Sequence, residues 1–395
     1  MTQLRRVVTS DGRISFSVVD ELGDALGWIE DYLVFATDQF SPNTVQSYAR
    51  SLADWAEVLA LRGEAWDDFH SEAFGDFLNY IRYGDTPGTP RIGPPPKVAA
   101  PATVQARSAA VLAFYTWQAD VNGVTTPYER LFSAKRRAGR SPYKPMLEGV
   151  APRSDTRATI YKVRSGPRRR TPVLTPNQVN TILDACSQQG TDGEWSNPPA
   201  GLRDRLLFAT LSETGMRIGQ ALSLRHHDWI LGRGSQPAIR LAARQDHPHG
   251  VRSKSSENLI YISDSLERLY SAYAWHLTDM GIDAYVPDFP HHFAFVNLAK
   301  PPYFAPMRSE SVQQKIRGIS KAHPSLPDKW SAHWFRHTHA SALLLSGVPP
   351  HVVQQRLGHA DVQTTLNTYG WVTADAELRA LSGWKDFTAG WETHR

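Results

Sequence analysis

Three short segments in the second half of the chain carry side chains that suit chemistry on a phosphate. Arg217 lies just after Gly215, where one helix is expected to end and another to begin, so its guanidinium could clamp a phosphate through two hydrogen bonds. Lys254 lies at an expected hairpin turn. His333 and Arg336, spaced i and i+3, share one face of an expected helix. Together these side chains supply the cations and the proton carrier that oxyanion chemistry requires.

A fourth segment combines a turn histidine with a phenol. His359 follows Gly358, where a helix is expected to end, and Tyr369 completes a helical stripe that begins at Val362. A tyrosine hydroxyl has an ordinary pKa of about 10, and it acts as a nucleophile once a base or a positive field lowers the cost of ionisation. Taken singly, each of these residues also fits a structural role, as a surface arginine, a loop lysine or an apolar-stripe tyrosine.

The histidine-rich helix leaves a metal interpretation open. His333 and His337 have the i, i+4 spacing of two zinc ligands, but the HExxH motif requires a glutamate where this chain has Trp334. The sequence contains no Walker phosphate loop and no dinucleotide glycine fingerprint. We therefore expect no metal and no cofactor, with a histidine-based metal protein as the alternative.

In order and spacing, the four segments resemble the tyrosine recombinase family of the phage-integrase type. The pattern is Arg, Lys, His-x-x-Arg, Leu-Gly-His and Thr-Thr-x-x-x-Tyr, and the match covers residues 171–371. The resemblance implies that Tyr369 attacks the scissile phosphate and forms a 3′-phosphotyrosyl link. It also implies that Arg217 and Arg336 bind the non-bridging oxygens and that Lys254 protonates the leaving 5′-hydroxyl.

The same resemblance implies the remaining roles and exposes two departures. His333 would assist proton transfer, and His359 would donate a hydrogen bond to the phosphate. The chain has Gln220 where an acidic residue is usual and Trp371 where a histidine is common. Asp228 is a candidate to take the place of the missing acidic residue.

The implied activity is site-specific DNA recombination of the integrase or transposase type. A homotetramer would cut and rejoin double-stranded DNA through a Holliday junction, and accessory DNA-bending proteins or co-recombinases are compatible further partners. Fixed guanidinium groups can stabilise the charge that a phosphodiester gains in the transition state, so the reaction is expected to be metal-independent. A type IB topoisomerase-like relaxing enzyme and a non-catalytic DNA-binding protein on the same fold are the alternatives.

The charge distribution supports a polyanionic partner. Residues 130–170 hold thirteen lysines and arginines against Glu148 and Asp155, a net +11, and the formal charge of +4 leaves −7 for the rest of the chain. A solvated basic linker is the alternative. The candidate DNA-binding residues are Lys135, Arg136, Arg137, Arg140, Arg168, Arg169 and Arg170.

The elements that must position these residues form two expected domains. The fold class is mainly α with a small β-sheet: a helical bundle similar to the family's SAM-like core-binding domain, then an α+β catalytic domain. Expected strands are 238–243, 258–263 and 293–297. The expected boundaries are an N-terminal extension at 1–20, a helical DNA-clamp domain at 21–128, a basic linker at 129–170 and the catalytic domain at 171–395.

Composition bounds the class of protein. The chain has 395 residues, 41% of them hydrophobic and 21% charged, which is typical of a globular protein with two cores. Its single cysteine, Cys186, excludes an internal disulfide framework. No apolar run predicts a signal peptide or a membrane span, so we expect a cytoplasmic protein. An amphipathic tail helix is expected over residues 374–391, docked either on its own subunit or on a neighbour.

Overall fold

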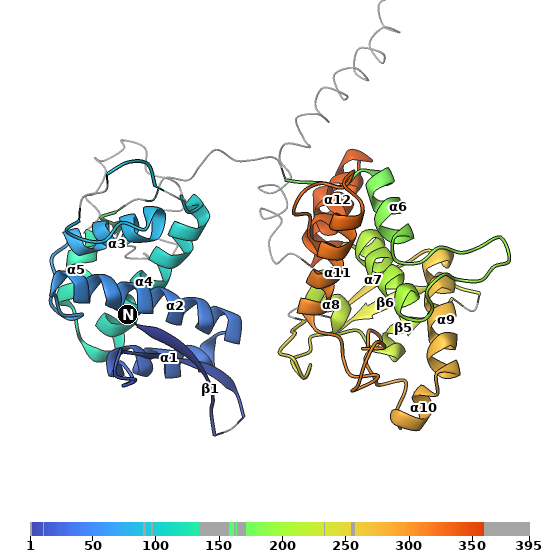
Figure 1. The fold of residues 1–395 in the computed structure, drawn as a ribbon, viewed down its shortest axis with the longest axis horizontal. Helices are drawn as coiled ribbons and strands as arrows, with labels where there is room; N and C mark the ends of the chain where they lie inside the picture. The colour runs from blue at the N-terminus through green and yellow to red at the C-terminus, as the bar shows by residue number, and fades with distance from the viewer. Residues whose placement is uncertain are drawn as a thin grey trace, which may run out of the picture. The chain divides into compact units, whose positions relative to one another are not determined.

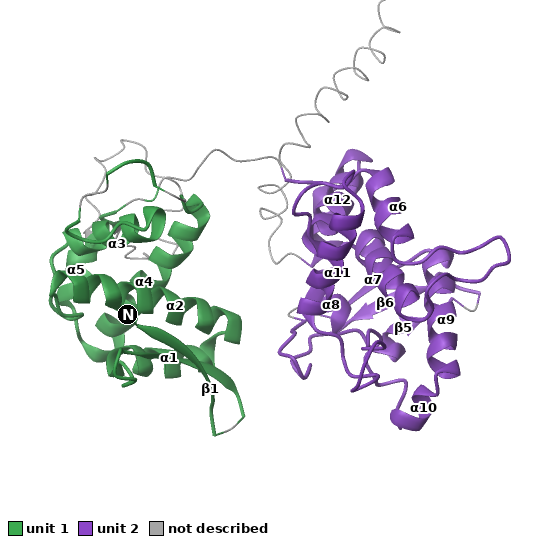
Figure 2. Cartoon of the chain, viewed as in Figure 1, with its two compact units in different colours: residues 1–168 green, residues 169–395 purple. Residues whose placement is uncertain are grey.

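The computed structural model divides into two compact units, residues 1–168 and 169–395 (Figure 2). The described residues are 2–10, 12–89, 92–95, 98–133, 158–161, 163, 171–232, 234–253 and 257–358. The expected tail helix lies outside them. Among the described residues, no helix is long and apolar enough to cross a membrane.

Unit 1 is a helical bundle that follows the expected pattern. Its helices are α1 (Gly27–Gln39), α2 (Pro42–Arg62), α3 (Glu72–Tyr83), α4 (Pro101–Asn122) and the short α5 (Thr126–Leu131) (Figure 1). Glycines at 63, 84 and 123 end α2, α3 and α4 in the left-handed conformation, which glycine adopts without strain. The expected helical bundle is therefore confirmed.

An aromatic core holds the bundle together. The Trp55 ring packs edge-on against Phe69, Phe77 and Tyr115, with centroids 5.2, 5.3 and 6.3 Å away. Trp55 Nε1 donates to Tyr115 Oη at 2.8 Å, and that hydroxyl donates to the Trp66 carbonyl at 2.8 Å. The two polar atoms in this apolar centre are therefore paired, as burial requires.

Part of the expected N-terminal extension, residues 1–20, forms a β-hairpin on the bundle. Strands β1 (Gln3–Val8) and β2 (Ile14–Val19) pair antiparallel. Phe16 and Val18 of β2 belong to the core of unit 1, and the Val18 amide donates to Glu30 of α1 at 2.9 Å. The hairpin is thus part of the folded unit.

The described ends of the expected linker also fold with unit 1. Strand β3 (Phe132–Ser133) pairs antiparallel with β4 (Ala158–Thr159), and the Tyr161 ring lies 5.8 Å from that of Phe74 in α3. The chain on each side of residues 134–157 is therefore anchored at one place on unit 1.

Unit 2 surrounds a buried helix with other helices and a three-stranded sheet. Helix α7 (Ala200–Thr214) is buried or half-buried along its whole length and packs against α6 (Pro176–Asp184), α9 (Asp264–Asp279) and α12 (Ala332–Leu345). Its buried charges, Arg203 and Asp204, pair with each other, as burial requires. The other elements are α8 (Ile218–Leu222), η1 (His226–Asp228), β5 (Trp229–Ile230), β6 (Ala238–Leu241), β7 (Asn258–Tyr261), α10 (Ile282–Tyr285), α11 (Ser309–Ala322) and α13 (Pro350–Leu357).

One expected strand of unit 2 is wrong. The sheet has the antiparallel order β5-β6-β7, and residues 293–297 do not join it. This buried run makes only isolated bridges, Phe293 with Arg225 and Val296 with Pro306. The Val296 carbonyl instead accepts from Arg203 of α7 at 2.9 Å, so a side chain takes the place of a neighbouring strand. A short apolar run predicts burial but does not distinguish a strand from a buried loop.

Candidate active site

The junction between α7 and α8 presents Arg217. Gly215 ends α7 with φ +65°, and Arg217 is the exposed residue that precedes α8. The Arg217 amide donates to Oε1 of Gln220 at 2.6 Å. A Cβ on Gly215 would lie 2.7 Å from Cδ2 of His339 and 2.9 Å from Cδ2 of Leu357, so α12 and α13 approach this turn too closely for any side chain.

Arg336 is buried beneath that junction. Only 2% of Arg336 is exposed, and its Nη1 and Nη2 donate to the carbonyls of Gly215 and Leu357, each at 2.9 Å. Both carbonyls lie at the carboxyl ends of helices, α7 and α13, where the helix dipole is negative. The guanidinium therefore joins the segment before Arg217 to the segment before His359.

His333 lies one turn before Arg336 on α12 and is influenced by both arginines. Partial burial, the Arg336 charge and the Arg217 charge, in that order, lower the pKa of His333. The ring is therefore neutral near pH 7 and able to accept a proton. The structure thus brings three of the predicted residues, Arg217, His333 and Arg336, into one electrostatic neighbourhood, which we call the arginine cluster.

The β6–β7 hairpin packs its backbone against the same short helix. A Cβ on Gly219 of α8 would lie 2.8 Å from the Arg252 carbonyl oxygen. Ser253 forms an isolated bridge with Arg244, with N–O distances of 2.9 and 3.0 Å. The chain therefore reaches residue 253 next to the helix that follows Arg217, and Lys254 itself lies outside the described residues.

Asp228 and Gln220 have separate tasks. The Asp228 carboxylate is fully buried, pairs with Arg244 at 2.8 Å, and accepts from the Arg225 amide at 2.8 Å. It thereby fixes the strand that leads into the hairpin before Lys254. The side chain of Gln220 instead holds the backbone of Arg217. The hypothesis that Asp228 takes over the Gln220 position is therefore not supported by these contacts.

The remaining predicted residues lie outside the part of the chain that the structure describes. Helix α13 ends at Gly358 with φ +65°, as expected, and the description stops there. The residues concerned are Lys254, His359, Tyr369, Lys135, Arg136, Arg137, Arg140, Arg168, Arg169 and Arg170. Their roles stay predictions.

The histidines of α12 do not form a described metal site. The rings of His333 and His337 meet edge to face with centroids 4.3 Å apart. Among the described residues, no group of three or more His, Cys, Asp or Glu side chains is arranged to hold a metal ion.

A polar groove in unit 1 was missed by the sequence analysis. This groove of about 470 Å³ lies between α2 and α4. Its polar lining residues are Asn43, Gln46, Ser47, Arg50, Ser51, Thr103 and Arg107. The i, i+3, i+4, i+7 spacing of the first four was the available signal, because it places amides, a hydroxyl and a guanidinium on one helix face.

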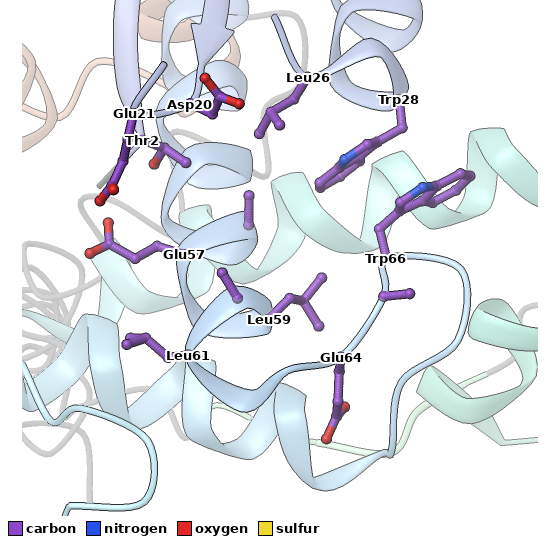
Figure 3. A pocket seen from close by; sticks show the side chains of 13 residues that line it. Thr2, Asp20, Glu21, Leu26, Trp28, Glu57, Leu59, Leu61, Glu64 and Trp66 are labelled. Carbon is purple, nitrogen blue, oxygen red and sulfur yellow. The ribbon is translucent and has the colours of Figure 1, made fainter. Parts of the chain in front are cut away.

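A second cavity in unit 1, of about 570 Å³, has the opposite character. The carboxylates of Asp20, Glu21 and Glu57 lie toward one side, and the stacked rings of Trp28 and Trp66, 5.6 Å apart, toward the other (Figure 3). Carboxylates repel phosphate, so this cavity does not suit a nucleic acid.

Comparisons with known proteins define the class. Residues 172–375 match the family model described as "Phage integrase family". This match covers more than half of the chain, which therefore belongs to the phage integrase family. The assignment confirms the resemblance drawn from the sequence, and with it a DNA strand-transferring enzyme of the tyrosine recombinase type.

Individual relatives agree with this assignment. Transposase A from transposon Tn554 of Staphylococcus aureus is 28% identical over 330 residues, 83% of this chain and 82% of the relative. Tyrosine recombinase XerD of Rickettsia conorii is 23% identical over 352 residues, 86% and 92% of the two chains.

Solved structures confirm the fold class. XerH site-specific recombinase, in a post-cleavage complex with its palindromic difH substrate, has a TM-score of 0.57 at 16% identity and covers 90% of this chain and 84% of its own. The Tn1549 transposon integrase, in complex with transposon right end DNA, has a TM-score of 0.54 at 17% identity and covers 90% and 99%.

Proposed function

We propose that the chain is a site-specific DNA recombinase whose Tyr369 hydroxyl attacks the scissile phosphate. The observation that carries this proposal is the arginine cluster: the carbonyls of Gly215 and Leu357 hold Arg336 beneath the α7–α8 turn, and Arg217 leaves that turn two residues after Gly215. The charges of both arginines also lower the pKa of His333. Two guanidinium groups near one turn suit the transfer of a single anionic group. This arrangement favours the chemistry over a protein that only holds DNA.

The cluster would act mainly in the transition state. A phosphodiester under attack gains charge on its non-bridging oxygens, and a preorganised guanidinium binds that charge more strongly than it binds the ground state. The guanidinium of Arg336 is preorganised because its Nη1 and Nη2 each donate a hydrogen bond to a backbone carbonyl. Since the cations come from the chain itself, we propose that the reaction proceeds without a metal ion.

Proton transfer would complete the reaction. Formation of the phenolate of Tyr369 near pH 7 costs about 4 kcal/mol, which a neutral base such as His333 can reduce. The new bond joins the phenol oxygen to phosphorus, and the bond to the 5′ oxygen breaks. Lys254 would give its proton to that leaving oxygen, and His359 would donate to a phosphate oxygen. The covalent link conserves the phosphodiester, so the strands can be rejoined without ATP.

Double-stranded DNA is the proposed partner. The two cited structures are complexes with DNA, the palindromic difH substrate and transposon right end DNA, and Transposase A belongs to a transposon. We propose that a homotetramer carries out strand exchange through a Holliday junction, with accessory DNA-bending proteins or co-recombinases as further partners. The proposed domains are a DNA clamp at 21–128, a basic linker at 129–170 that contacts phosphates and a catalytic domain at 171–395. The proposed location is the cytoplasm.

The polar groove of unit 1 is a proposed DNA contact. Its amides and hydroxyls can donate to or accept from base edges and phosphates, and Arg50 supplies positive charge, whereas the charge of Arg107 is paired with Asp54. We expect Arg50→Ala to weaken DNA binding and to reduce the log–log salt slope by about 1.

The test is covalent trapping on nicked DNA. A pool of labelled duplexes with randomised sequence, each nicked just 3′ of the cleavage position, loses the short 5′-hydroxyl fragment after attack and traps the protein on DNA. We expect a denaturant-resistant adduct that Tyr369→Phe abolishes and that exposed Tyr285→Phe leaves intact. EDTA should leave the yield unchanged. An adduct that persists in Tyr369→Phe would contradict the assignment of Tyr369 as the nucleophile. The duplexes that the wild-type protein selects from the pool serve as defined substrates in the later experiments.

Recombination is distinguished from DNA relaxation by its products. Two selected duplexes of different length should yield exchanged molecules. Relaxation of supercoiled DNA without exchanged products would favour the topoisomerase-like alternative.

A further inference from the structure

The carboxyl end of α7 is buried, and its carbonyls are bound by side chains of other helices. The last carbonyls of a helix have no partner within the helix and must be satisfied elsewhere when water is excluded. Here Ser212, Glu213 and Gly215 each accept from a side chain on α12 or α13. One of the three donors is Arg336 of the arginine cluster, and the other two are His339 and Arg356.

His339 has both ring nitrogens committed. Its Nδ1 lies 3.1 Å from the Ser212 carbonyl oxygen, so this nitrogen carries the hydrogen. Its Nε2 accepts from Nε of Arg356 at 3.0 Å, so this nitrogen carries none. The ring is therefore neutral with a fixed tautomer, and its Cδ2 fills the space that a side chain on Gly215 would need.

Arg356 extends the same contact to two further elements. Its Nη2 donates to the Glu213 carbonyl at 3.1 Å and to the Tyr261 carbonyl at 3.2 Å. Arg356 thereby binds α13 to the end of α7 and to β7. It lies two residues before Gly358, where α13 ends.

We propose that His339 and Arg356 are positioning residues that hold the three phosphate-binding segments in one register. Their shared hydrogen bond fixes α12 and α13 against the α7–α8 junction, so that Arg217 and Arg336 meet the same phosphate. Neither residue is assigned a contact with DNA. This inference rests on the proposed function, because the register matters only if one phosphate is transferred there.

Two substitutions at one position separate the two hydrogen bonds of the histidine. In His339→Asn, the shorter amide can still donate to Ser212 but does not reach Arg356. In His339→Gln, the amide oxygen can take the place of Nε2 and accept from Arg356. We expect the asparagine variant and Arg356→Gln to cleave about 100-fold more slowly than wild type, because small misplacements of reacting groups cost about that much. The glutamine variant should retain a larger share of the rate.

The experiment is single-turnover cleavage of a selected nicked duplex by saturating full-length protein. The rate constant reports the chemical step, and the amplitude of the adduct reports the folded fraction. Binding to the uncut duplex is measured in the Tyr369→Phe background. Matched controls are His276→Asn on α9 and exposed Arg317→Gln on α11, which should both cleave at the wild-type rate.

The supporting result for each single variant is a lower rate constant of cleavage with unchanged DNA affinity. The double variant, His339→Asn with Arg356→Gln, should cleave no more slowly than the slower of the two single variants. Rate losses that multiply in the double variant would overturn the shared contact. Wild-type rates in both single variants, or a loss confined to amplitude, would overturn the positioning role. If the wild-type protein itself forms no Tyr369-dependent adduct, the proposed function fails and this inference fails with it, an outcome that differs from a wild-type adduct whose rate the two variants leave unchanged.

Discussion

The centres of the two units bury opposite chemistry. Unit 1 is built around Trp55 and Tyr115, aromatic rings whose two polar atoms pair with each other and with one carbonyl. Unit 2 buries the guanidinium of Arg336 beside the ends of two helices. Burial of a charge is expensive and is weak evidence for a stabilising role. We propose that the first centre serves the fold, whereas buried Arg336 serves the phosphate site proposed above.

Arg336 should show the largest effect. Arg336→Ala removes a cation from the proposed transition state, so we expect the cleavage rate to fall about 10²–10³-fold. It also leaves two buried carbonyls without this donor, which should lower the free energy of unfolding by about 2–4 kcal/mol. Adduct kinetics and chemical denaturation measure the two effects. A fully active variant would mean that the buried charge serves only the fold.

Two glycines that end helices, one in each unit, allow a second comparison between the units. Gly123 and Gly215 have φ of +68° and +65°, but only the second would place a Cβ against another side chain. We expect Gly215→Ala to lower the free energy of unfolding by about 2–4 kcal/mol, from backbone strain and a clash with His339. Gly123→Ala should show the strain alone, about 1–2 kcal/mol. Equal losses in denaturation experiments would contradict the close approach.

The pH dependence of stability tests the buried histidine of unit 2. Burial first, then the nearby charge of Arg356, lower the pKa of His339 to about 4, with Arg336 adding to the shift and the Ser212 carbonyl opposing it. The unfolded chain then binds a proton that the folded chain does not between about pH 6.5 and 4, so stability falls as the pH is lowered through this window. The pKa of His247 is also lowered to about 4, so its protonation lowers the stability of the folded chain over the same pH range.

The difference between wild type and His339→Gln isolates this contribution. We expect the wild-type unfolding free energy to lose about 3 kcal/mol more than that of the variant between pH 7 and 4. Parallel curves would show that His339 is not held neutral.

Tyr115→Phe should give the smallest effect. The change leaves the Trp55 indole and the Trp66 carbonyl without their shared partner, which should cost about 1–2 kcal/mol in unfolding free energy. The rate constant of cleavage should not change, because these residues hold only the core of unit 1. A slower chemical step in Tyr115→Phe would contradict the claim that the centre of unit 1 serves only the fold.

Local patterns predicted the elements better than the site. Glycine stops gave the ends of α7 and α13, and two of the expected strands match β6 and β7, whereas α9 was not predicted. The N-terminal hairpin was missed although ISFSVV alternates and Asp-Gly precedes it. Its stability depends on Phe16 and Val18 packing on the bundle, which no local pattern reports.

For the site, spacing selected Arg217, His333 and Arg336 but not the contacts that position them. A motif gives residue types, whereas the Arg356–His339 bond joins residues seventeen positions apart and the Arg252 carbonyl meets Gly219 across a chain reversal. Such contacts depend on the tertiary arrangement of α7, α12 and α13. They became visible only in three dimensions.

The central claim is that Arg217 and Arg336 act on one phosphate, and a neutral substrate tests it most directly. A methylphosphonate at the scissile position removes the charge of one non-bridging oxygen. We predict that the rate deficits of Arg217→Ala and Arg336→Ala, each relative to wild type, become smaller on this substrate than on the normal phosphate. Deficits that are unchanged for either variant would contradict the claim, because that guanidinium would then act somewhere other than on the scissile phosphate.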